Sequence, residues 1–129
     1  MKSSKQFTFT KEYGSLGEVM TDHGLASLGD TYINFIYSLA MSERSGKPLG
    51  AKVRGSILAE ALKRAGLREH MPSRVSKHAI ADAAEALAVY AWLKKHVTLE
   101  ECVSILCSNE EPVDGLTKLF LLIRDRVKF

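Results

Sequence analysis

Residues 79–93 read AIADAAEALAVYAWL, and Asp82 and Glu85 are the only charged side chains in this run. Residues 24–41, GLASLGDTYINFIYSLAM, likewise hold a single charged side chain, that of Asp30. Apolar residues in both runs recur at helical spacing and cover most of the circumference of a helix. Helices of that kind lie in the middle of a bundle, so the two runs predict the central, most buried pair of an all-α fold.

The remainder of the chain also follows the helical period, and very little of it alternates in the manner of a strand. Thr10 is placed to cap a short helix that reaches towards Met20. Turn residues over 45–50 indicate a loop after a helix at about 25–43, and Gly66 is a candidate stop for the next helix. The apolar set expected to face the core from these two helices consists of Leu25, Leu28, Tyr32, Phe35, Ile36 and Leu39 in the first and Ile57, Leu58, Ala61 and Leu62 in the second.

Local signals also divide the C-terminal half of the chain. Pro72 and Ser73 are typical of a helix start, which predicts a long helix that continues to about His96. Thr98 and Glu101 form a capping box, in which each side chain accepts a hydrogen bond from a free N–H group at the helix start. The two last helices present their apolar stripes as Leu99, Cys102, Val103 and Leu106, and, after the turn at Pro112, as Leu116, Leu119, Phe120, Ile123 and Val127. The prediction is a bundle of five to seven helices.

The composition is typical of one soluble globular domain over residues 1–129. Apolar residues make up 46% and charged residues 26%, which excludes disordered and fibrous proteins. No apolar run approaches the ~20 residues of a membrane span, and residues 1–6 are polar and lysine-bearing, unlike a signal peptide. Cys102 and Cys107 match neither a disulfide framework nor a zinc spacing. We therefore expect a reduced, cytoplasmic protein, whose net charge of +3 permits an anionic partner without requiring one.

The three acids are the informative feature of the two apolar runs. Neither run offers a lysine or arginine within its own span, and an unpaired carboxylate in apolar surroundings is costly. Asp82 and Glu85 are three residues apart, so they share a helix face and can converge with Asp30 from the neighbouring helix. Hard divalent ions prefer such oxygen ligands, which favours a metal site. The alternative is a narrow solvated stripe of acids that pair with basic residues from elsewhere.

Two histidines and four basic residues lie near the predicted site. His23 precedes Asp30 by seven residues and His78 precedes Asp82 by four, so each is a candidate for the rim of the site. For either one, the favoured interpretation is a solvent-facing or hydrogen-bonded histidine without a functional role. The basic residues that lead towards the site, and that can meet an approaching phosphate backbone, are Lys52, Arg54, Arg74 and Lys77.

Two acidic motifs stand in order along the chain, LGD at 28–30 and, about fifty residues later, DAAEAL at 82–87. Between them lie LAEAL at 58–62 and AGL at 65–67. In this order and at this separation, the motifs resemble the endonuclease domain of the ribonuclease III family over roughly residues 22–95. In that family a leucine-glycine-aspartate ends the signature helix, and the second acidic motif is an aspartate and a glutamate three apart, followed by alanine and leucine.

The resemblance implies an all-α, ribonuclease III-like helical bundle. It also implies a homodimeric endoribonuclease that hydrolyses double-stranded or structured RNA with Mg²⁺ and leaves 5′-phosphate products. Asp30, Asp82 and Glu85 match three of the family's acidic positions, as catalytic residues and metal ligands. In such a site the carboxylates hold the ion, and the ion activates water for attack on the phosphodiester. We expect no double-stranded-RNA-binding domain, and in this respect the chain is similar to the stand-alone Mini-III type.

The chain departs from the family's pattern at two positions. The signature helix normally carries glutamates seven and four residues before its aspartate, and here those positions hold His23 and Ala26. Alanine has no ligand atom, and a histidine nitrogen suits Mn²⁺ or a transition metal better than Mg²⁺. Two other interpretations therefore stay open. One is a catalytically impaired helical dimer that binds RNA or protein, and the other is a helical phosphohydrolase acting on nucleotides, supported only by the spacing of His78 and Asp82.

Overall fold

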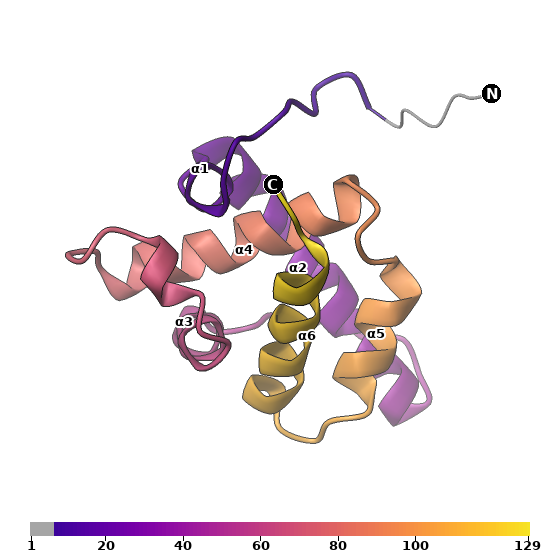
Figure 1. Ribbon diagram of the computed structural model, residues 1–129. Coiled ribbons are helices and arrows are strands. Elements are labelled where there is room, and N and C mark those ends of the chain that lie inside the picture. Colours follow the sequence, from indigo (N-terminus) through magenta and orange to yellow (C-terminus); the bar gives the residue numbers. More distant parts are fainter. Residues whose placement is uncertain (1–6) are drawn as a thin grey trace.

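The computed structural model describes residues 7–129, and within that range it contains six α-helices and one short 3₁₀ helix but no strand (Figure 1). The prediction of an all-α bundle with five to seven helices is confirmed. The prediction about a signal peptide concerns residues 1–6 and lies outside the described residues. In chain order the elements are α1 (Leu16–Met20), α2 (His23–Ser45), α3 (Gly55–Arg64), the 3₁₀ helix η1 (Arg68–His70), α4 (Lys77–Leu93), α5 (Leu99–Cys107) and α6 (Pro112–Arg126).

α4 is the central helix of the bundle, as its sequence predicts. Its residues from Ala86 to Ala91 are all buried. The helices α1, α2, α3 and α6 all pack against it, and Figure 1 shows it crossing the molecule between them. Many of the buried residues of α4 are alanines, whose single methyl groups let several helices approach the same axis.

α2 is buried along one face only, so the prediction that it belongs with α4 to the most buried pair of helices is wrong. Ile33 and Ile36 are completely buried. By contrast, Leu28 and Phe35, which were expected in the core, are 39% and 53% exposed. α2 packs mainly on α4 and α5, and this arrangement leaves one apolar side of α2 without a neighbouring helix among the described residues.

The two helices with the acidic motifs meet at Gly29. A Cβ atom built on Gly29 would overlap the backbone carbonyl of Glu85 and would lie 3.1 Å from the backbone nitrogen of Ala86. A glycine is therefore required at this point of α2, because only a residue without a side chain lets the two backbones come into contact. The same crossing brings Asp30, the next residue of α2, beside Glu85.

The start of α1 differs from the prediction. Ser15, and not Thr10, caps this helix, and its Oγ accepts a hydrogen bond from the Glu18 N–H at 3.2 Å. The Thr10 hydroxyl instead donates to the carbonyl oxygen of Phe7 at 2.8 Å. The helix therefore begins later than the cap position at Thr10 suggests.

The start of α4 also differs, because Pro72 and Ser73 lie outside the helix. Both of their carbonyl oxygens accept hydrogen bonds of 2.9 Å from the Arg68 guanidinium. Ser76 caps α4 instead, and its Oγ accepts from the Ala79 N–H at 3.1 Å. A contact from the preceding segment thus holds 72–73 in a loop that the local sequence pattern assigns to the helix.

Two other boundary signals are confirmed. The Thr98 Oγ1 accepts from the Glu101 N–H and the Glu101 carboxylate accepts from the Thr98 N–H, both at 3.0 Å, which completes the capping box of α5. Gly66 has φ 76°, in the left-handed region that favours glycine, and follows the end of α3. The Leu67 N–H then donates to the Leu62 carbonyl at 3.2 Å, which closes the end of the helix.

Cys102 and Cys107 are both free, in agreement with their spacing. Cys102 is buried and accepts a 3.4 Å hydrogen bond from the Tyr32 hydroxyl. Within residues 7–129, none of the helices combines the length and the apolar character needed to cross a membrane.

Candidate functional site

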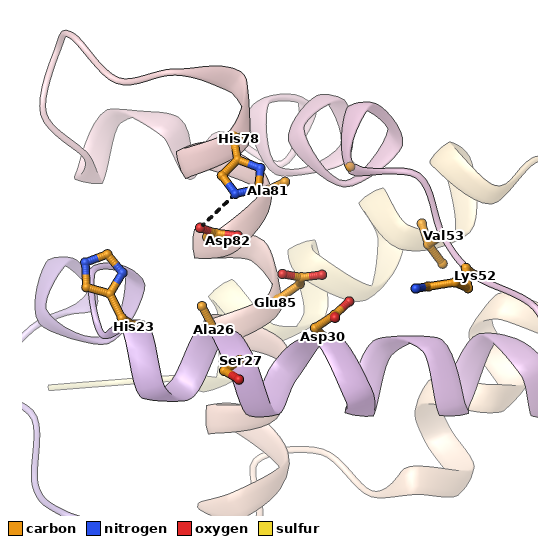
Figure 2. Close-up of a pocket in the computed structure, with 11 residues that line it drawn as sticks. His23, Ala26, Ser27, Asp30, Lys52, Val53, His78, Ala81, Asp82 and Glu85 are labelled. Carbon is orange, nitrogen blue, oxygen red and sulfur yellow. Dashed lines mark ion pairs between the residues drawn. The ribbon is translucent and has the colours of Figure 1, made fainter.

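An open pocket of about 500 Å³ lies between the N-terminal half of α2, the first turns of α4 and the segment that leads into α3 (Figure 2). All three predicted acids line it. The complete lining is His23, Ala26, Ser27, Asp30, Lys52, Val53, Gly55, His78, Ala81, Asp82 and Glu85. The helical register on α4 and the close crossing at Gly29 together bring side chains from three parts of the chain to one surface.

Asp30 and Glu85 form the closest acidic pair in this pocket. Glu85 is half-buried, and its carboxyl group hydrogen-bonds with the Asp30 side chain. Burial is the largest influence on Glu85, followed by this hydrogen bond and the charges of Asp30 and Asp82, and together they raise the pKa of Glu85 to about 8. Glu85 therefore keeps its proton at neutral pH when no cation is present.

Asp82 lies one helical turn before Glu85 and contacts a histidine. The His78 Nε2 lies 3.7 Å from the Asp82 Oδ2, as the dashed line in Figure 2 marks. The His78 side chain is 88% exposed, so solvent weakens this ion pair. Within residues 7–129, neither Asp30 nor Glu85 forms an ion pair with a lysine or arginine. The sequence analysis left open that each of the three acids pairs with a basic residue. At Asp30 and Glu85 the structure gives that alternative no support.

One of the four predicted basic residues reaches the pocket. Lys52 lines it, and Figure 2 shows its side chain directed towards Asp30 and Glu85. Its ammonium group opposes the rise in the pKa of Glu85. Arg54, Arg74 and Lys77 are exposed and lie outside the lining of this pocket.

The comparison with known protein families bears directly on this pocket. A family model described as Ribonuclease III matches residues 23–119, from the first residue of α2 into α6. The chain belongs to the ribonuclease III family. Its all-helical architecture agrees with the ribonuclease III endonuclease domain predicted from the two acidic motifs, and Asp30, Asp82 and Glu85 all fall within the matched residues. A search of curated proteins gave no match.

The two positions where this ribonuclease III chain lacks glutamates both face the pocket. His23 and Ala26 are part of its lining, from the first turn of α2. Asp22 does not take their place, because its Oδ1 caps α2 at the Leu25 N–H and its Oδ2 accepts from the Tyr13 hydroxyl, at 2.9 and 2.7 Å. These hydrogen bonds, the Tyr13 one first, lower the pKa of Asp22.

The donor set of the pocket fits a hard divalent ion in its chemistry. Three carboxylates face one open, solvent-accessible space, and a positive charge there would offset the burial and the neighbouring acids that raise the pKa of Glu85. Within residues 7–129, however, no three histidine, cysteine or acidic side chains stand together as a ready set of ligands. Mg²⁺ often binds through one or two carboxylates and keeps several waters, so Asp30 and Glu85 satisfy its usual protein contribution.

The sequence analysis missed one polar residue beside the acidic pocket, Asn34, which contacts Asp30. Its Nδ2 donates to the Asp30 Oδ1 at 3.0 Å and to the Asp30 carbonyl at 2.9 Å. Its Oδ1 accepts from the Val53 N–H at 2.8 Å. The spacing of four residues between Asp30 and Asn34 indicates that they share a helix face, but the contact with Val53 crosses a long loop and leaves no local signal.

Proposed function

We propose that this chain is a metal-dependent endoribonuclease that hydrolyses double-stranded or structured RNA to products with 5′-phosphates. The observation that carries the proposal is the convergence of Asp30, Asp82 and Glu85 on one open pocket within a ribonuclease III domain. Two helices from distant parts of the sequence supply these carboxylates, and Asp30 and Glu85 pair with each other and with no lysine or arginine of the described chain. A substrate phosphate and a cation can therefore enter the pocket together.

We propose Mg²⁺ as the cofactor, with Mn²⁺ as the second candidate because His23 adds a nitrogen donor to the pocket. Asp30 and Glu85 would hold the ion, and Asp82 is the third ligand in the proposal. When bound, such an ion lowers the pKa of water and stabilises negative charge on a phosphodiester. Loss of the Glu85 proton would free a second carboxylate for the ion, so binding would release this proton near neutral pH.

Residues 1–129 act in this proposal as one catalytic domain that functions as a homodimer. An apolar pocket of about 340 Å³ lies beside the exposed apolar side of α2, between this helix, the C-terminal part of α4 and the segment around Phe7 and Phe9. Its lining is Phe7, Phe9, Leu28, Thr31, Tyr32, Phe35, Val89, Trp92 and Leu93. Exposed apolar patches of this kind mark protein contacts, and a second copy of the chain would bury Leu28 and Phe35.

Incubation with a long RNA duplex tests the enzymatic proposal. The wild-type protein should shorten the duplex in Mg²⁺ or Mn²⁺, EDTA should stop the reaction, and a 5′-phosphate-dependent exonuclease should degrade the products. Asp82→Asn and Glu85→Gln should each lower the rate by about 100-fold or more. Glu60→Gln is the matched control, because Glu60 lies outside the pocket and pairs with Arg64 on the surface of α3. Equal cleavage by the wild type and by Asp82→Asn would assign the activity to a contaminant.

The second candidate is a catalytically impaired ribonuclease III-like dimer that binds RNA or protein. Two observations favour it. Ala26 stands where the family carries an acid, and no ready trio of metal ligands is present within the described residues. This candidate predicts that the wild type binds an RNA duplex but does not shorten it in either metal.

A further inference from the structure

A row of polar side chains runs along α2 from the acidic pocket towards its C-terminal end. Asn34, Ser38 and Ser42 are four residues apart, so they lie above one another on a single helix face. Each of them hydrogen-bonds to the backbone of 49–53, the extended segment that returns alongside α2 before α3 begins.

The two serines bind this segment in the same way. The Ser42 Oγ accepts from the Leu49 N–H at 2.9 Å and donates to the Leu49 carbonyl at 3.1 Å. The Ser38 Oγ accepts from the Ala51 N–H at 2.8 Å and donates to the Ala51 carbonyl at 3.0 Å. The row therefore hydrogen-bonds to every second residue of the segment. Two residues of the segment span about the same length as one turn of α2.

Asn34 is the end of the row, and its contacts differ from those of the serines. Its Oδ1 accepts from the Val53 N–H at 2.8 Å, while its Nδ2 donates to the Asp30 Oδ1 at 3.0 Å. A side-chain amide is suited to this place, because it donates to a carboxylate and accepts from a peptide N–H at the same time. One side chain thus connects an acid of the pocket to the backbone beside Lys52.

Lys52 stands between the two residues that Ser38 and Asn34 hold. The neighbours Ala51 and Val53 turn their backbone groups to α2, and the Lys52 side chain extends into the acidic pocket (Figure 2). Within residues 7–129 the Lys52 ammonium forms no ion pair. It is therefore available to an anionic ligand that enters the pocket.

We propose that Asn34 is a positioning residue, which fixes Lys52 opposite Asp30 so that the ammonium group contacts a backbone phosphate of bound RNA. This inference rests on the proposed function, since it takes RNA as the ligand of the pocket. The hydrogen bond to Val53 places the cation, and the hydrogen bond to Asp30 keeps that carboxylate turned to the same space. Asn34 acts through Lys52 and does not itself contact the substrate.

A double-mutant cycle on the affinity for a defined RNA duplex, measured in EDTA at several salt concentrations, tests this coupling. Lys52→Met should weaken binding by about tenfold and lower the slope of log K against log salt by about one, because one phosphate contact is lost. Asn34→Ala should produce the same two changes. The double variant Asn34→Ala/Lys52→Met should bind no more weakly than Lys52→Met alone.

Two further variants separate positioning from a loss of stability. Ser42→Ala is the matched control, since it removes two hydrogen bonds to the same segment at the far end of the row and should leave the salt slope unchanged. Asn34→Asp keeps the acceptor for the Val53 N–H. Lys52→Met in that background should therefore still lower the affinity for the RNA duplex by about tenfold. Thermal unfolding of each variant confirms that it is folded.

Additive losses in the cycle, or an unchanged salt slope in Asn34→Ala, would overturn the positioning role while the proposed function stands. An identical change in the salt slope of Ser42→Ala would show that Asn34 only stabilises the segment and does not position Lys52. Absence of RNA binding by the wild type would overturn the proposed function, and the inference with it.

Discussion

The carboxyl groups of Asp30 and Glu85 face the same pocket beside Gly29, where the backbones of α2 and α4 are in contact. Gly29 allows the two backbones to touch at this point, and the raised pKa of Glu85, about 8, keeps this carboxyl group protonated at neutral pH. Ionisation of Glu85 in the folded protein therefore costs free energy. We expect a divalent ion to compete with this proton, so the proposed binding can be measured before any RNA is added.

In EDTA, the stability of the protein should fall as the pH rises from about 5 to about 8. The pKa of Glu85 in the folded protein is about 8 and lies above its ordinary value of 4.5, so the folded state binds more protons than the unfolded state in this window. The loss should be ~1–2 kcal/mol, less than the shift alone implies because Glu85 is partly exposed. Urea unfolding at pH 5, 6, 7 and 8 measures it.

Glu85→Gln should flatten this pH dependence, because the glutamine does not titrate. Glu60→Gln is the control and should leave it unchanged, since Arg64 lowers the pKa of Glu60 and keeps its titration below the window. Saturating Mn²⁺ should reverse the trend in the wild type and stabilise the protein more at pH 8 than at pH 5. A flat profile for the wild type in EDTA would show that Glu85 ionises normally.

Gly29→Ala should destabilise the protein by about 3 kcal/mol or more, or prevent folding, because its Cβ would overlap the carbonyl of Glu85. Gly55→Ala is a matched control at the start of α3, where a Cβ would meet only the Ala81 Cβ at an ordinary 3.6 Å. That variant should stay within about 1 kcal/mol of the wild type. Thermal unfolding of both variants compares them, and equal melting temperatures would contradict the close crossing.

The sequence predicts much of the fold because helical periodicity depends on neighbours three and four residues apart. It identifies α4 as the central helix, and the capping box at Thr98 and the stop at Gly66 follow from local chemistry. The same periodicity fails for Leu28 and Phe35. An apolar stripe shows that a helix face can be buried, but it does not show whether a neighbouring helix of the same chain covers it.

For the acidic pocket, too, the sequence predicts the features that depend on local pattern and misses those that depend on long-range contacts. The exclusion of other charges predicts that Asp30 and Glu85 belong together, and the structure places them in one pocket, although their catalytic roles stay predictions. Lys52 could be suspected only as one of four basic residues. Lys52 reaches the pocket because residues 49–53 return along α2, where Asn34 and two serines hold them. Such a long-range contact leaves no periodic pattern in the sequence.

Ala26→Glu should tighten Mn²⁺ binding by about tenfold, because it adds a carboxylate to a pocket that Ala26 already lines. In EDTA the same variant should be less stable than the wild type, since a fourth acid adds repulsion. Isothermal titration calorimetry measures the affinity. Thr31→Glu is the control: it adds the same charge to α2, but Thr31 lines the apolar pocket and not the acidic one. Equal affinity gains in both variants would show a general charge effect instead of a new ligand.

Phe35→Asp should leave the protein monomeric at concentrations where the wild type is a dimer. Phe35 is 53% exposed beside an apolar pocket, and a charge placed there would have to be desolvated when a second copy docks. Sedimentation velocity across a range of protein concentrations gives the association constant of each variant. In Phe35→Asp, the loss of the dimer should also lower the cleavage of both strands of a duplex. Mn²⁺ binding should not change, because the acidic pocket lies within one chain.

Leu121→Asp is the matched control for this surface. Leu121 is 40% exposed on α6 and does not line the apolar pocket of α2, so its replacement should leave the association constant unchanged. If Phe35→Asp dimerises as tightly as the wild type while Leu121→Asp does not, the contact between copies lies on α6. A wild type that stays monomeric at all concentrations would remove the dimer from the proposal.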